Sequence, residues 1–240
     1  MSRRLKFFLS HLFISMCVGF AVIGLIFLVW YPAPLAKAVG VTHISLMLLT
    51  IDVILGPILG FIVFKEGKKT LKIDLTVIVI LQLCALSYGL FNIYQGKPAW
   101  LVFQNDHFDL IRLNDALVTK NIQKENGMNP QFKAVDMGKT PVEKNKYLVE
   151  EMQTGIPASY RVERYTPIEK SAVQLLKEKR NLQVLKAFNE QDQIDKVVER
   201  YSDAVGWLPL RVLTGIDMVV LIDKHGAVLG IADLRPWKLS

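Results

Sequence analysis

Apolar residues are concentrated in the first hundred positions of the chain, in three long stretches. These stretches are Phe7–Trp30, His43–Phe64 and Leu75–Tyr94. Each is close to the ~20 residues that an α-helix needs, at about 1.5 Å per residue, to cross a hydrocarbon layer ~30 Å thick. A secretory signal peptide is a poor interpretation of the first stretch, because its apolar part is too long and no small-residue cleavage site follows it. The pattern predicts a transmembrane domain of three α-helices over residues 1–95.

The pattern of hydrophobic residues changes after the third stretch. Residues 100–113 contain two β-rich runs around Asn105-Asp106, which predicts a short hairpin or a bulged strand pair. Start signals, such as Thr-Pro followed by an acidic residue, predict helices over about 141–152 and 167–179, and amphipathic segments predict two more over 116–125 and 192–201. Three apolar runs near the C-terminus predict a meander of antiparallel strands. Residues 96–240 are therefore expected to form an α+β domain.

Basic residues in the short connections indicate how the three stretches are oriented. Seven of them lie at the N-terminus and in the second connection, while the first connection has one. Since Lys and Arg are retained on the cytoplasmic side, the N-terminus is expected in the cytoplasm and residues 96–240 on the opposite side. The seven are Arg3, Arg4, Lys6, Lys65, Lys68, Lys69 and Lys72, and the one is Lys37.

Composition and motifs narrow the classes of function. The net charge of +7 belongs mostly to residues 1–95, so it fits membrane orientation and anionic lipid rather than nucleic acid. Both cysteines lie in apolar stretches and the four histidines occur singly, so no metal site is predicted. Residues 106–109 (DHFD) fit a solvated turn. No nucleotide, cofactor or catalytic motif is found, and we do not expect an enzyme.

The second apolar stretch carries a carboxylate, within IDVILGPILGFIVFK at residues 51–65. Asp52 lies about 12 residues, or ~18 Å, from the end of the stretch, near the middle of a bilayer. A charged carboxylate at that depth costs ~2.5–3.5 kcal/mol on an insertion scale. We therefore expect Asp52 to be protonated, paired or turned towards another helix. Ser87 and Tyr88 lie at the same depth in the third stretch, and one of them is predicted to donate a hydrogen bond to Asp52.

Small residues accompany this carboxylate. Pro57 has no N–H and bends a helix, while Gly56 and Gly60 form a face that another backbone can approach closely. Asp52, Gly56 and Gly60 are spaced four apart and lie on one stripe. With Pro57, Ser87 and Tyr88 they form the candidate site for binding a partner helix. Two other interpretations remain open: the stripe holds the three helices together, or Asp52 belongs to a proton or ion relay.

The region from residue 51 to residue 100 resembles the TfpX/TfpZ family of type IV pilin accessory proteins. The resemblance lies in D-x-x-x-G-P, G-K-K-x-L-K-x-D-L, Q-x-x-A-L-x-Y-G and G-x-P, and in G-x-x-x-G-x-x-D-L-R-P-W at residues 226–237. Gly60 departs from the family pattern, in which threonine is expected. The positions carried over are Asp52, Gly56, Pro57, Lys68, Lys69, Asp74, Gln82, Tyr88 and Pro98.

The resemblance implies a protein of the inner membrane of a Gram-negative bacterium, with residues 96–240 in the periplasm. It implies a chaperone or assembly modulator for a type IV pilin, which is either a major or a minor subunit. Membrane lipid and other pilus-assembly proteins are the further partners it implies. The alternative is a membrane-anchored periplasmic sensor or scaffold that binds another envelope ligand. A third interpretation, a small transporter or an enzyme subunit, is supported by Asp52 alone.

Overall fold

The computed structural model of the chain describes residues 2–117, 127–138 and 140–238. The chain divides into two compact units. The helical unit comprises residues 1–36 and 40–95, and the sheet unit comprises residues 37–39 and 96–240. The short helix α2 (Leu35–Val39) lies where the chain passes from one unit to the other.

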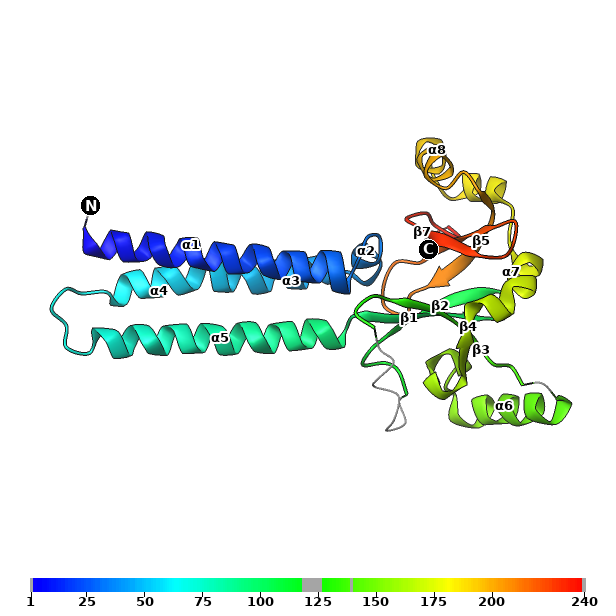
Figure 1. The fold of residues 1–240 in the computed structure, drawn as a ribbon, viewed down its shortest axis with the longest axis horizontal. Helices are drawn as coiled ribbons and strands as arrows, with labels where there is room; N and C mark the ends of the chain where they lie inside the picture. Colours follow the sequence, from blue (N-terminus) through cyan, green and yellow to red (C-terminus); the bar gives the residue numbers. More distant parts are fainter. Residues whose placement is uncertain (1, 118–126, 139, 239–240) are drawn as a thin grey trace. The chain divides into compact units, whose positions relative to one another are not determined.

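Three long apolar helices make up the helical unit (Figure 1). The first consists of α1 (Arg3–Gly24) and the π-helical segment η1 (Leu25–Trp30). The second consists of α3 (Val41–Thr50), the π-helical segment η2 (Ile51–Leu55) and α4 (Gly56–Val63), and the third is α5 (Leu71–Gln95). Their length and composition suffice to cross a membrane. The prediction of three spanning helices is therefore confirmed.

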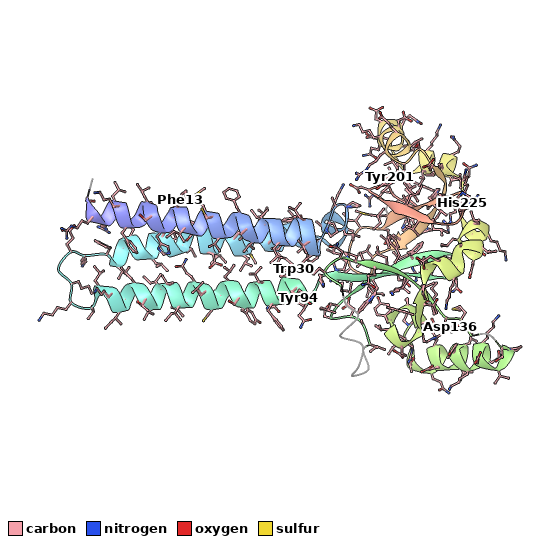
Figure 2. The ribbon with its side chains drawn as sticks, viewed as in Figure 1. Phe13, Trp30, Tyr94, Asp136, Tyr201 and His225 are labelled. Atoms are coloured by element: carbon pink, nitrogen blue, oxygen red, sulfur yellow. The ribbon has the colours of Figure 1, made fainter. Side chains whose placement is uncertain are left out.

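Side chains at one end of the helical unit connect the first and third helices. Tyr31 Oη donates a hydrogen bond to the main-chain oxygen of Ile93 at 2.6 Å. The rings of Trp30 and Tyr94 pack edge to face, with their centroids 5.2 Å apart, and lie close together in Figure 2. Such aromatic side chains are enriched where a membrane meets water.

A seven-stranded mixed sheet forms the centre of the sheet unit (Figure 1). The strand order is β4-β3-β1-β2-β5-β6-β7, with parallel pairing of β1 with β3 and of β2 with β5 and antiparallel pairing elsewhere. The predicted hairpin and the predicted C-terminal meander are both confirmed. The strands are β1 (Pro98–Gln104), β2 (His107–Arg112), β3 (Gln131–Val135), β4 (Tyr165–Pro167), β5 (Ala204–Arg211), β6 (Met218–Asp223) and β7 (Val228–Ala232).

The described part of residues 96–240 contains the α-helices α6, α7 and α8, and two of them agree with the prediction. These two are α6 (Pro141–Thr154), whose N-terminus has a capping box between Thr140 and Glu143, and α8 (Gln191–Arg200). The third, α7, covers only Ala172–Glu178. Its predicted start at Pro167 was wrong, because Tyr165–Pro167 pairs with β3 as an edge strand, where proline is tolerated. The helix predicted over 116–125 falls mainly outside the described residues.

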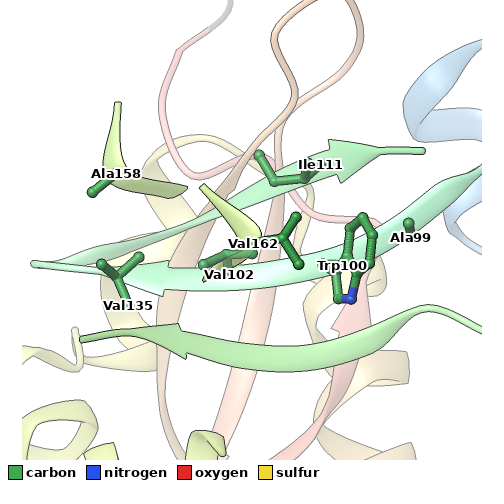
Figure 3. Close-up of a cluster of buried hydrophobic side chains, with 7 residues drawn as sticks. All are labelled: Ala99, Trp100, Val102, Ile111, Val135, Ala158 and Val162. Carbon is green, nitrogen blue, oxygen red and sulfur yellow. The ribbon is translucent and has the colours of Figure 1, made fainter. Parts of the chain in front are cut away.

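Buried side chains pack on the sheet in two clusters. The first includes Trp100 and Val102 of β1 with Ile111 of β2, and is drawn in Figure 3. All seven residues of β1 are buried, so both faces of this central strand are covered. The second cluster gathers around Trp207 of β5, with Leu185, Ile194, Val219, Leu221, Ala232 and Leu234.

Candidate functional site

Asp52 lies in a π-helical segment of the second helix, and the following proline explains this geometry. In a π-helix the N–H of each residue bonds to the carbonyl five positions before it. The residue five positions after Asp52 is Pro57, which has no N–H to donate. Gln82 of α5 supplies the missing donor, because its Nε2 donates a hydrogen bond to the main-chain oxygen of Asp52 at 3.1 Å.

The two glycines of the predicted stripe allow close packing with the chain's own side chains. A Cβ atom at Gly56 would collide with the amide of Gln82, and one at Gly60 would lie 3.0 Å from Phe7 and 3.3 Å from His11. Gly56, Pro57 and Gly60 are all buried. The glycine stripe therefore packs against α1 and α5, as the internal-packing interpretation expected.

The prediction that Ser87 or Tyr88 would donate a hydrogen bond to Asp52 was wrong. Gln82 is the residue of α5 that reaches Asp52, while Ser87 is exposed and Tyr88 is 73% exposed. The reason is helical geometry. Gln82 and Gly89 are seven residues apart and share the face that packs on the second helix, where Gly89 approaches Leu48. Ser87 and Tyr88 lie off that face.

A groove of about 360 Å³ opens beside Asp52, between α1 and α5. Its lining is mostly apolar, with Ile14 and Val18 on α1 and Val79, Leu83 and Leu86 on α5. The polar side chains in the lining are Ser10, His11, Ser15, Asp52 and Gln82. The groove therefore combines an apolar surface, suited to a hydrocarbon environment, with a small polar centre.

The polar centre has unused hydrogen-bonding capacity. Asp52 is only 9% exposed, and its Oδ2 has no hydrogen-bond partner among the described residues. The side chains of Gln82 and His11 lie against each other, but Gln82 Oε1 and His11 Nδ1 form no well-aligned hydrogen bond within the described part of the chain. Leaving a buried polar group unsatisfied costs about 1–3 kcal/mol. Such a group in a membrane-spanning segment indicates a functional site.

The sheet unit contains a second polar cluster, around Asp109 of β2. Ser159 Oγ donates to Asp109 Oδ2 at 2.7 Å, and Arg211 Nε donates to Asp109 Oδ1 at 3.0 Å. His107 lies between two carboxylates, with Nδ1 2.9 Å from Asp106 Oδ1 and Nε2 3.5 Å from Asp109 Oδ1. The expectation of a solvated turn was wrong at Asp109, which is 7% exposed, because the β2–β5 pairing encloses it.

These contacts shift two pKa values. Burial alone would raise the pKa of Asp109, but hydrogen bonds from His107 and Ser159, with the nearby positive charges, hold it below its usual range. Burial alone would lower the pKa of His107, but its contacts with Asp109 and Asp106 raise it above its usual value. Ser159 and Arg211, the hydrogen-bond donors to Asp109, are distant from it in sequence, so the local DHFD motif could not have revealed the burial of Asp109.

No group of three or more His, Cys, Asp or Glu side chains that could hold a metal ion occurs within residues 2–117, 127–138 and 140–238. The polar side chains that line the groove can offer hydrogen bonds to a partner.

Comparison with known proteins identifies relatives of this chain. Residues 1–40 match the model of the family described as fimbrial assembly protein FimB. The chain is 37% identical over 110 residues to the fimbrial assembly protein of Dichelobacter nodosus serogroup E1, and 36% identical over 110 residues to that of serogroup I. Each match covers 45% of this chain and 43% of the relative, so the chain spans less than half the length of these two relatives.

A third relative is covered over most of its length. The chain is 36% identical to the fimbrial assembly protein of Dichelobacter nodosus serogroups C1 and C2 over 110 residues, which are 45% of this chain and 84% of the relative. No solved structure matches the chain. With three apolar helices of membrane length, a mixed-sheet unit and this shared sequence, the chain belongs to the fimbrial assembly protein family.

Proposed function

We propose that this protein is a type IV pilin accessory protein of the bacterial inner membrane, which acts as a chaperone or assembly modulator for a specific pilin. The names of the curated relatives support a role in fimbrial assembly. The resemblance of residues 51–100 to TfpX/TfpZ proteins supports the pilin as partner. The observation that carries the proposal is the groove beside Asp52, since it offers a partner a polar recognition feature inside the membrane.

The orientation proposed for the chain follows from its basic residues. The N-terminus and the connection between α4 and α5 lie at the same end of the helical unit (Figure 1), and seven Lys and Arg residues belong to these two segments. The positive-inside rule places this end in the cytoplasm. Residues 1–95 then form the membrane domain and residues 96–240 form the periplasmic domain.

Each part of the protein then has a counterpart in its client. A pilin that awaits assembly is held in the membrane by one apolar helix and carries its globular head outside. The helical unit would meet the helix of the pilin, with Asp52 as the central contact, while residues 96–240 would meet the head. Gly56, Pro57 and Gly60 shape the groove by allowing close packing, and the exposed Ser87 and Tyr88 remain candidates for contact at the same depth.

Affinity purification tests this function. The tagged full-length chain is expressed at its native level, extracted in mild detergent and analysed by mass spectrometry for co-purifying proteins. Enrichment of a type IV pilin over an untagged control supports the proposal, as does loss of surface pili on deletion and their return on complementation. Recovery of the chain alone, or with unrelated envelope proteins, would overturn the proposal and favour the sensor or scaffold.

A further inference from the structure

The side chains that line the groove indicate what kind of molecule it binds. We infer that it receives the membrane-spanning helix of the client subunit, and that it recognises this helix by a hydrogen-bond donor presented to Asp52 and Gln82. This inference rests on the proposed function, because the client is the pilin. The juxtaposition that carries it is an apolar groove whose floor holds two polar side chains with unused oxygen atoms.

The amide orientation of Gln82 shows why a donor is required. Its Nε2 donates to the main-chain oxygen of Asp52, so Oε1 is the atom left for another partner. An amide oxygen can only accept hydrogen bonds. Asp52 Oδ2, on the second helix, also has no hydrogen-bond partner among the described residues. A hydroxyl, an amide N–H or an ammonium group of the client could donate to either oxygen.

The apolar lining indicates a helix as the carrier of this donor. Ile14 and Val18 on one side and Val79, Leu83 and Leu86 on the other would contact aliphatic side chains. A lipid acyl chain would also suit these walls, but it has no donor and would leave both oxygens unsatisfied in hydrocarbon. A transmembrane helix with one polar side chain satisfies both parts of the groove, because interhelical hydrogen bonds form readily between such helices.

Contacts within the helical unit hold the two walls of the groove. α1 and α5 each pack along the second helix, and the Tyr31–Ile93 hydrogen bond and the Trp30–Tyr94 contact link the first and third helices at one end. A site held in its binding geometry loses less conformational entropy when it is occupied. The groove is therefore prepared to receive the side chains of one face of a helix.

Photo-crosslinking in cells that produce the pilin tests where the client lies. A photoreactive amino acid replaces either Leu83, which lines the groove, or Leu81, which does not. The two leucines form a matched pair, because they lie on the same helix and are 57% and 64% exposed. We expect a crosslink to the pilin from position 83 and none from position 81.

Substitution of Asp52 tests how the client is recognised. Asp52→Asn keeps one carbonyl acceptor and should reduce the crosslink from position 83 modestly. Asp52→Leu removes the acceptors while keeping a similar volume, and should reduce the crosslink about tenfold or more, the change expected for ~1.4 kcal/mol of lost binding. Unchanged protease resistance of the helical unit shows that each variant still folds.

Three outcomes would contradict the inference, and a fourth would contradict the proposed function. If the pilin co-purifies but crosslinks equally from positions 81 and 83, or only from 81, the groove is not its binding site. The proposed function would still stand. A crosslink from position 83 to lipid or to a second copy of the chain overturns the inference in the same way. If Asp52→Leu and the wild type crosslink equally, the client is not recognised through a hydrogen bond to Asp52. If no pilin co-purifies at all, the proposed function itself fails.

Discussion

Gln82 donates a hydrogen bond to the main-chain oxygen of Asp52, 30 positions away in the sequence, at 3.1 Å. This bond compensates for the missing N–H of Pro57 and places a polar side chain of the third helix against the second. The approach requires that Gly56 have no Cβ atom. Pro57 and Gly56 thus allow Gln82 to lie against Asp52 at the groove.

Gly56→Ala should destabilise the helical unit. The added methyl group collides with the Gln82 amide, so either that side chain moves and the carbonyl of Asp52 loses its donor, or the helices separate. Because these atoms are the far end of a flexible side chain, the main cost is the lost donor to the Asp52 carbonyl, about 1–3 kcal/mol for a buried acceptor. The expected result is a lower melting temperature of the full-length protein in detergent, measured by far-ultraviolet circular dichroism.

Gly24→Ala is the control for this experiment. Gly24 is also helical, but nothing lies within 4 Å of the Cβ atom that alanine would add. Alanine is favoured over glycine in a helix interior by roughly 0.5–1 kcal/mol, so the melting temperature should stay the same or rise. Equal melting temperatures for the two variants would show that the Gly56–Gln82 contact is unimportant for stability.

Much of the architecture is predictable from local sequence patterns, whereas the site is not. The three apolar helices follow from length and composition, and α6 follows from the capping signals of Thr140 and Glu143. The depth of Asp52 singled it out as a candidate functional residue, but it could not reveal which residue of the third helix reaches it. Helix rotation decides between Gln82 and Tyr88, and it depends on contacts such as that of Gly89 with Leu48.

The sheet unit illustrates the same limit. The β1–β2 hairpin and the β5–β7 meander join neighbouring segments, and their signals are local. The parallel pairing of β2 with β5 joins segments about a hundred residues apart, and it encloses Asp109 beside Arg211. Non-local pairing leaves no periodic pattern in the sequence, so the buried polar cluster around Asp109 could not be predicted.

The stability of the sheet unit should decrease as the pH rises through neutrality, because of His107. Its contacts with Asp109 and Asp106 raise the pKa of His107 in the folded state above the ordinary value of 6.5. The protonated imidazole therefore stabilises the folded state fully below about pH 6.5, and this contribution is lost as the pH rises through the folded pKa. Thermal unfolding of the full-length protein at about pH 6 and about pH 8.5 measures the loss.

His107→Gln should remove most of this pH dependence, because the variant has no imidazole at the cluster to lose its proton between about pH 6 and about pH 8.5. His225→Gln serves as the matched control, because His225 is exposed in the turn between β6 and β7, and it should keep the dependence of the wild type. If His107→Gln and the wild type unfold with the same pH profile, another group is responsible.

Ser159→Ala should weaken the Asp109 cluster without changing its charge. The variant loses the hydroxyl that donates to Asp109 Oδ2 at 2.7 Å, at a cost of about 1–3 kcal/mol for a buried acceptor. Because this bond helps to keep the pKa of Asp109 low, the variant should also lose stability at a higher pH on acidification. Urea unfolding at neutral and acidic pH separates the two effects. The exposed Ser202→Ala should behave as the wild type in both conditions.

Reporter fusions should place the two ends of the helical unit on opposite sides of the membrane. The positive-inside rule counts Lys and Arg rather than net charge, so the ion pair of Lys68 with Asp74, at 2.6 Å, does not weaken the prediction for the second connection. Alkaline phosphatase, which is active only in the periplasm, should be active when it is fused after Trp237 and inactive when it is inserted after Gly67. Green fluorescent protein exported through the general secretory route should give the opposite pattern. Phosphatase activity at Gly67 would reverse the orientation and place residues 96–240 in the cytoplasm, where they could not meet the head of a pilin.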